Sequence, residues 1–222
     1  MLTTGRPGAG LAPGVHGFGF TLVELMITIS ILALLLAIAV PSMTTWIQNT
    51  MIRTSAEEAL AGLAHARNEA LKRNTPVRFQ FLSALDNSCE VKGSGTNWMV
   101  TAPATDGSQD VVDPSGQCKD LIDAAPPSRA MVEFKSSAAG SKHAIIAASA
   151  AGVEAGVVTF NGVGRLSGAG NVDTIDITNP TGGQCAPDGD MRCLRIIVSS
   201  GGQVKLCDPK VTDVADTRRC QF

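Results

Sequence analysis

Six cysteines and three histidines are the side chains of this 222-residue chain best suited to metal binding or redox chemistry. The cysteines are Cys89, Cys118, Cys185, Cys193, Cys207 and Cys220. No two of them have C-x-x-C spacing and the histidines are isolated, so we do not expect a metal site. An even number of cysteines in an exported domain favours disulfides, and their spacing alone leaves the pairing open.

The sequence offers little for catalysis. It contains no H-E-x-x-H, G-x-S-x-G or P-loop motif. Gly162, Gly164 and Gly168 form a glycine-rich stretch, but their spacing departs from G-x-G-x-x-G and no helical pattern follows. We therefore expect neither an enzyme nor a bound cofactor, and we interpret the stretch, which includes Asn161-Gly162, as a hairpin turn.

One carboxylate lies in an unusual place, because Glu24 is the only ionisable side chain between Phe20 and Val40. This apolar run is long enough to cross a membrane as a helix, which takes about 20 residues. A carboxylate inside such a helix costs about 3 kcal/mol, so we expect it only where it meets a partner. A signal peptide with a cleavage site at Ala37-Ile38-Ala39 and a generic membrane anchor both leave Glu24 unexplained.

The segment Gly19-Phe-Thr-Leu-Val-Glu-Leu25 resembles the processing site of type IV pilins and type II secretion pseudopilins. The resemblance implies that a prepilin peptidase removes residues 1–19 and that Phe20 becomes the N-methylated first residue. Glu24 is then the fifth residue of the mature chain. The new amine of Phe20 in a neighbouring subunit could pair with Glu24, which would offset the cost of burying either charge.

Helical spacing continues beyond Pro41, where we expect a kink in a continuous helix. Apolar residues recur at steps of three and four, which predicts that residues 41–75 form an amphipathic continuation of the 20–40 helix. The predicted buried stripe is Ile52, Ala56, Leu60, Leu63, Ala66 and Ala70, and the predicted polar face is Arg53, Glu57, His65, Asn68, Glu69, Lys72 and Arg73. Arg53 with Glu57 and Glu69 with Arg73 are expected ion pairs.

Strand patterns replace the helical period after Pro76. Short apolar runs bounded by turn residues predict strands at 77–81, 97–101, 131–134, 144–147, 157–160, 174–177, 193–198 and 203–206. A long helix followed by a mainly antiparallel sheet gives an α+β class. The residues after the apolar run, about 180 in number, suit the second half of the helix, 41–75, and one globular domain, 76–222, behind it.

Two further segments resemble the GspH/FimT family of minor pilins and pseudopilins, which has a type IV pilin-like fold. They are Ala64-His-Ala-Arg-Asn-Glu-Ala-Leu-Lys-Arg-Asn74 at the helix end and Phe160-Asn-Gly-Val-Gly164. A cysteine pair near the C-terminus occurs in this family, which implies a bond between Cys207 and Cys220 that pins the tail. We expect the remaining cysteines to pair sequentially, Cys89 with Cys118 and Cys185 with Cys193.

The resemblance implies a FimT/FimU-like minor pilin, a structural subunit that joins or initiates a pilus. The expected partners are other major and minor pilins, the prepilin peptidase and the inner membrane. The chain is expected to cross this membrane once, with its domain in the periplasm. Once the subunit is assembled in a pilus, the domain is expected to lie outside the cell. A GspH-type pseudopilin of type II secretion is the first alternative. The second is a DNA-binding pilin of natural transformation that uses Lys205, Arg218 and Arg219, but the net charge of −2 and five nearby aspartates disfavour DNA.

Overall fold

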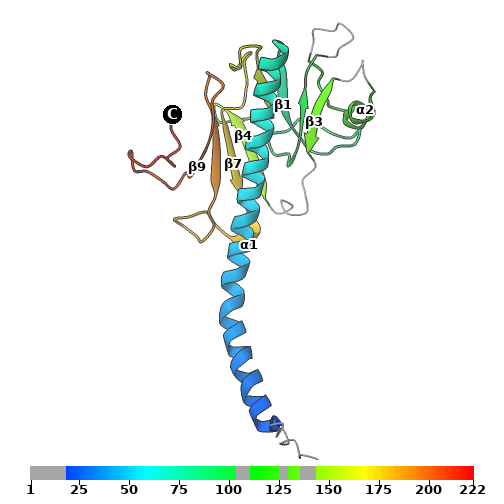
Figure 1. Cartoon of the computed structure of the whole chain (residues 1–222). Coiled ribbons are helices and arrows are strands. Elements are labelled where there is room, and N and C mark those ends of the chain that lie inside the picture. The colour runs from blue at the N-terminus through cyan, green and yellow to red at the C-terminus, as the bar shows by residue number, and fades with distance from the viewer. Residues whose placement is uncertain (1–18, 104–110, 126–129, 136–143) are drawn as a thin grey trace, which may run out of the picture. The chain divides into compact units, whose positions relative to one another are not determined.

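The computed structural model describes residues 19–103, 111–125, 130–135 and 144–222 (Figure 1). The leader prediction, residues 1–19, lies outside the described residues except for Gly19. In chain order the elements are α1 (Leu22–Arg73), β1 (Val77–Leu82), β2 (Asn97–Thr101), α2 (Cys118–Asp123), β3 (Met131–Lys135), β4 (Ile145–Ala150), β5 (Val153–Glu154), β6 (Val157–Phe160), β7 (Thr174–Thr178), a 3-10 turn (Pro180–Gly182), β8 (Leu194–Val198) and β9 (Val204–Cys207). A helix followed by antiparallel strands confirms the α+β prediction.

The chain forms two compact units, Met1–Pro41 and Ser42–Phe222, and α1 begins in the first and ends in the second. Pro41 lies within the bounds of α1, and a kink there stays a prediction. The helix ends where Asn74 adopts a left-handed φ of 52° and Pro76 prevents continuation.

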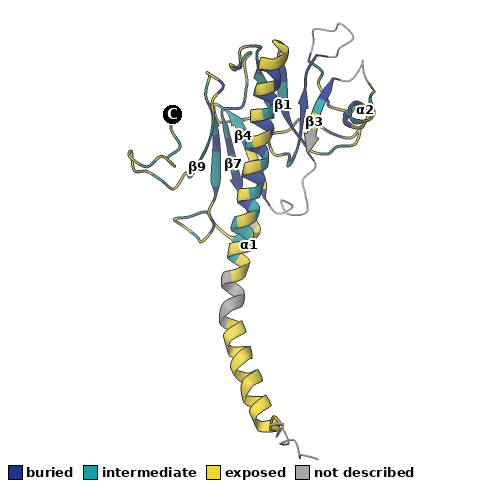
Figure 2. Ribbon diagram, in the orientation of Figure 1, coloured by how far each residue is buried: buried dark blue, intermediate teal, exposed yellow. Residues whose placement is uncertain are grey.

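One face of α1 is buried in the second unit (Figure 2). The predicted stripe forms this face, with Ile52, Ala56, Leu63, Ala66 and Ala70 fully buried and Leu60 packed against the core at its margin. Gly62 allows the helix to lie close to the sheet, since a Cβ there would come within 2.7 Å of the Phe79 ring and 3.0 Å of the Trp98 ring.

The prediction that Glu69 lies on the exposed face is wrong. Glu69 is only 8% exposed, and its carboxylate accepts a hydrogen bond from Nε of Arg73 at 2.6 Å. The hydrogen bond from Arg73 holds the pKa of Glu69 below its ordinary value, against the opposing effect of burial. Both expected ion pairs form, with Arg53 and Glu57 2.7 Å apart on the exposed side.

The strands form two sheets, whereas the sequence pattern predicted only one. The first has the order β3-β2-β1-β6, and the second has the order β5-β4-β7-β8-β9. β1 pairs with β2 and with the distant β6, so that Phe79 lies opposite Val100 on one side and Val158 on the other. In the second sheet, β7 lies between β4 and β8, with Ile175 opposite Ala148 and Ile196.

The main core lies where α1 meets both sheets. Phe79, Phe81, Phe160, Ile175 and Ile196 are among its largest fully buried strand residues. A second, smaller cluster packs around Met99 and Leu121 beneath α2. Because β1 has apolar groups on both sides, even Gln80 is buried on this strand, where its Oε1 accepts a hydrogen bond from Thr101 at 2.9 Å.

The segment after β6 turns as predicted, but it does not join two strands of one ladder. β6 pairs with β1, and β7 pairs with β4 and β8. A single bridge, Phe160 to Leu166, closes the turn, and the side-chain oxygen of Asn161 accepts hydrogen bonds from the backbone nitrogens of Val163 and Arg165. Asn161 therefore shapes this turn through its side chain.

Candidate functional site

The predicted processing and assembly residues lie at the start of α1. Gly19 and Phe20 precede the helix and are exposed, and Thr21 accepts a hydrogen bond from the backbone nitrogen of Glu24 at 3.2 Å. Thr21 thus caps the helix, and Glu24 stands three residues later, as in a capping box. A carboxylate in the first turn also interacts favourably with the helix dipole. Glu24 therefore has a local role in its own subunit, whatever its role between subunits.

Residues 19–37, which include the start of the helix, are exposed (Figure 2), and most of them are apolar. Phe20 is 77% exposed, Leu22 74% and Leu34 66%. Among the residues that the structure describes, no helix has both the length and the apolar character needed to cross a membrane. Exposed apolar surface of this extent marks an interaction site, because burying each such side chain contributes about 1.5–3 kcal/mol.

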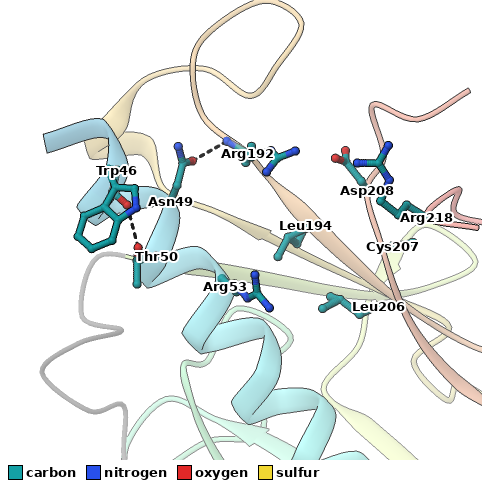
Figure 3. Close-up of a pocket in the computed structure, with 10 residues that line it drawn as sticks. All are labelled: Trp46, Asn49, Thr50, Arg53, Arg192, Leu194, Leu206, Cys207, Asp208 and Arg218. Carbon is teal, nitrogen blue, oxygen red and sulfur yellow. Dashed lines mark hydrogen bonds between the residues drawn. The ribbon is translucent and has the colours of Figure 1, made fainter. Parts of the chain in front are cut away.

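A cleft of about 690 Å³ lies in the second unit, between α1 and the end of the second sheet (Figure 3). Its lining residues are Trp46, Asn49, Thr50 and Arg53 from α1, with Arg192, Leu194, Leu206, Cys207, Asp208 and Arg218 from the strands and loops opposite. A second cavity of about 280 Å³ shares Arg192, Asp208 and Arg218 with the first and adds Lys210. The two cavities therefore adjoin, and we call them together the α1–tail cleft.

One hydrogen bond ties the two sides of the cleft together. The backbone nitrogen of Arg192 donates to the side-chain oxygen of Asn49 at 2.7 Å. This bond fixes the loop before β8 against α1 but leaves the Arg192 side chain exposed. Neither Trp46 nor Asn49 was predicted from the sequence to belong to a site. A tryptophan that lies among polar residues and outside the apolar stripe was the sequence feature that could have indicated a surface site here.

The predicted DNA-contact residues lie on β9 and the tail, and two of them have partners within the protein. Nζ of Lys205 donates to the backbone oxygen of Gln221 at 2.7 Å. Arg218 pairs with Asp216 at 2.7 Å, and its hydrogen bonds lower the pKa of Asp216 to about 2. Arg219 is half-buried. Part of the positive charge predicted for this surface is therefore matched locally.

The six cysteines form three disulfides, Cys89–Cys118, Cys185–Cys193 and Cys207–Cys220, in sequential order. No cysteine is free. Because every cysteine sulfur is in a disulfide, no thiolate remains as a nucleophile or metal ligand.

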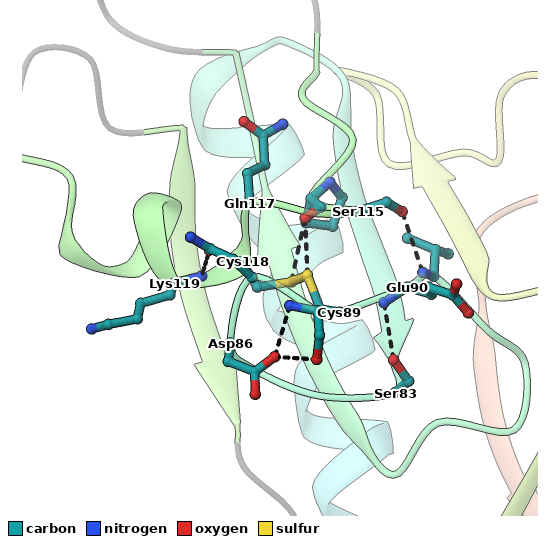
Figure 4. Close-up of a disulfide and its surroundings, with 12 residues drawn as sticks. Ser83, Asp86, Cys89, Glu90, Ser115, Gln117, Cys118 and Lys119 are labelled. Carbon is teal, nitrogen blue, oxygen red and sulfur yellow. Dashed lines mark hydrogen bonds between the residues drawn. A yellow bond between two sulfur atoms is a disulfide. The ribbon is translucent and has the colours of Figure 1, made fainter.

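The Cys89–Cys118 bond fastens the loop after β1 to α2 (Figure 4). Both cysteines are buried, and the hydroxyl of Ser115 accepts a hydrogen bond from the backbone nitrogen of Val91 nearby. Because α2 has only six residues, a helix this short would be unstable alone. The disulfide and the small apolar cluster therefore hold this region in place.

The Cys207–Cys220 bond fastens the C-terminal tail to β9. The backbone nitrogen of Asp208 also donates to the carbonyl oxygen of Arg218 at 2.8 Å. Asp208 and Arg218 both line the α1–tail cleft, so the disulfide positions one wall of the cleft.

Comparison with known proteins gives two family matches. Residues 55–202 match the family model described as type II transport protein GspH. Residues 18–40 match the prokaryotic N-terminal methylation motif. The search of curated proteins gives no significant match.

Among solved structures, the type IV minor pilin FimU of Pseudomonas aeruginosa is similar in two crystal forms. In one form the identity is 18% and the TM-score 0.42, over 69% of this chain and 90% of FimU. In the other the identity is again 18% and the TM-score 0.43, over 72% of this chain and 91% of FimU. The family assignment rests on the family models alone: because the GspH model covers well over half of the chain, this protein belongs to the GspH family of minor pilins and pseudopilins.

Proposed function

We propose that the protein is a minor type IV pilin, a structural subunit that joins or initiates a pilus. The observation that carries the proposal is the combination of an N-terminal methylation motif with a GspH domain in one chain. The exposed apolar side chains of Phe20 and of α1 from Leu22 to Leu36 supply the surface that such a subunit needs for a membrane or a filament core.

In this proposal a prepilin peptidase cuts after Gly19, and Phe20 is then N-methylated. Before assembly, residues 20–40 hold the chain in the inner membrane with the domain in the periplasm. In the filament, the Phe20 amine of one subunit pairs with Glu24 of its neighbour. The local cap supports this arrangement, because it holds Glu24 in the first turn, close to where the new N-terminus forms.

Substitution of Glu24 separates the capping role from the charge. Glu24→Gln keeps the length and the capping-box pattern but removes the negative charge. We expect this variant to enter sheared filaments at least about tenfold less than wild type, which corresponds to about 1.4 kcal/mol of lost pairing. Glu90→Gln, an exposed neutralisation in the second unit, serves as the control. Equal incorporation of Glu24→Gln and wild type would rule out the pairing.

A pseudopilin of type II secretion is the second candidate, and the description of the matched family favours it. Deleting the gene separates the two candidates. Loss of surface pili with normal protein secretion supports the minor pilin, whereas a secretion defect with normal pili supports the pseudopilin. In either role the protein is a structural subunit.

DNA uptake is the third candidate and the least supported. The intramolecular bonds of Lys205 and Arg218 occupy two of the three cations that would contact phosphates. Salt-sensitive DNA binding by the purified chain, lost on Arg218→Ala and Arg219→Ala, would revive it.

A further inference from the structure

We propose that the α1–tail cleft is a docking site for a neighbouring filament subunit, which inserts a segment with a carboxylate beside an apolar side chain. The inference rests on the proposed function, since it takes the partner from the same filament. It concerns the second unit only and is separate from the Phe20–Glu24 pairing.

The apolar part of the cleft suits a protein side chain. Trp46 is 65% exposed, and Leu194 and Leu206 line the strand side of the same cavity. An exposed tryptophan gains much from being covered, and tryptophan and arginine are the residues that most often dominate protein interfaces. Trp46 therefore has the properties of an interface anchor.

The charge of the cleft selects a carboxylate. Arg53, Arg192, Lys210 and Arg218 line the two cavities, against Asp208 as the only lining carboxylate among the described residues. These cations stand out in a chain whose overall charge is −2. An arginine guanidinium binds a carboxylate through two parallel hydrogen bonds, which gives direction as well as affinity.

Arg192 and Lys210 are the cleft cations most available to a partner, and of these two only Arg192 lines both cavities. Arg53 pairs with Glu57 and Arg218 with Asp216, whereas the described residues give the Arg192 guanidinium no ion pair or hydrogen bond. Its backbone is nevertheless fixed to α1 through Asn49. The guanidinium is thus held at the cleft without being neutralised.

The mixture of cations and carboxylates at the cleft disfavours nucleic acid as the occupant. Affinity for DNA grows with the number of phosphates that the protein neutralises. Asp208 lines the cleft, and Glu57 and Asp216 pair with two of its four cations, so few phosphates could be neutralised. One carboxylate next to an apolar group uses both Arg192 and Trp46, which a phosphate backbone would not do.

Site-specific cross-linking in the native host tests the proposal on the full chain. Thr50 lines the cleft and is exposed, so a photo-reactive p-benzoylphenylalanine at this position leaves Trp46 and Arg192 intact. We expect a cross-link to a subunit that itself begins with an N-methylation motif, within a peptide that contains Asp or Glu. Arg192→Glu should reduce the cross-link about tenfold, whereas Arg165→Glu, an exposed charge reversal in the turn after β6, should leave it unchanged.

A charge swap distinguishes the loss of a specific contact from misfolding of the Arg192→Glu variant. Changing the acidic residue of the cross-linked peptide to Arg should restore the cross-link to Arg192→Glu. A cross-link to DNA, a cross-link that is insensitive to Arg192→Glu, or no cross-link would overturn the proposal. Finding the chain in sheared filaments without the expected cross-link refutes the docking site alone. Absence of the chain from filaments refutes the proposed pilus function instead.

Discussion

Removing the Cys207–Cys220 disulfide tests how the C-terminal tail is held. The perturbation is the double substitution Cys207→Ala and Cys220→Ala, which removes both sulfurs and leaves no unpaired thiol. The tail then depends on non-covalent contacts, chiefly the Asp208–Arg218 backbone hydrogen bond and the Lys205–Gln221 hydrogen bond.

The magnitudes favour the disulfide as the dominant restraint. Its cysteines are 13 positions apart, and closing a loop of about 15 residues stabilises a fold by about 3 kcal/mol in the chain-entropy account. Each hydrogen bond contributes only about 1 kcal/mol net. We therefore expect the double variant to lose about 3 kcal/mol, a fall in Tm of about 6–12 °C for a protein of this size.

The assay is thermal and guanidinium unfolding of the full chain in detergent, followed through the fluorescence of the buried Trp98, with limited trypsin digestion of the tail. Lys205→Ala is the matched control, because it removes one tail hydrogen bond and keeps the disulfide; it should cost less than about 1 kcal/mol. A double variant as stable as Lys205→Ala, with an equally protected tail, would refute the reasoning.

Three further predictions concern the second unit. Leu63→Ala should destabilise the protein by about 2–5 kcal/mol in guanidinium unfolding, because Leu63 is fully buried, whereas Leu71→Ala on the exposed side should change stability by less than about 0.5 kcal/mol. Gly202→Ala should cost more than about 2 kcal/mol, since its φ is 77° and a Cβ would overlap a neighbouring carbonyl oxygen, whereas Gly201→Ala should be close to neutral. The pKa of Asp216 is lowered from 3.8 to about 2 by its arginine partner, so its stabilisation is present above about pH 4 and disappears as the pH falls through 2. The stability difference between wild type and Asp216→Asn should shrink over that range.

Specific results would contradict each of these three. Equal losses in Leu63→Ala and Leu71→Ala would mean that α1 does not bury the predicted face. A Gly202→Ala protein as stable as Gly201→Ala would exclude the close approach of Gly202 to the backbone of Gly164. A constant difference between wild type and Asp216→Asn from pH 5 to 2 would show that this carboxyl gains nothing from its partner.

Local patterns predicted the helix and most strands because burial imposes their periods directly. The α1 stripe repeats every three or four residues, and β2 and β6 have the predicted bounds. Local patterns misplaced Glu69, whose spacing puts it on the polar side. The hydrogen bond from Arg73 offsets the cost of burying Glu69, and hydrophobic periodicity takes no account of such a bond.

Features that depend on contacts between distant residues could not be predicted from local sequence patterns. Whether β6 pairs with β1 or β7 depends on contacts across some 80 residues, so the division into two sheets is not encoded in any one segment. α2 is held by a disulfide and packing, and its six residues carry too little helical pattern to be noticed. The α1–tail cleft joins Asn49 to Arg192, which are 143 positions apart.

The most direct test of the central claim is mass spectrometry of the chain in filaments sheared from the surface of the native host. We expect a mature chain that begins with N-methylated Phe20, is present at low abundance in purified pili, and is at least about tenfold less abundant in pili of the Glu24→Gln strain. Absence of the chain from purified pili, or a filament-borne chain that retains Gly19, would contradict it.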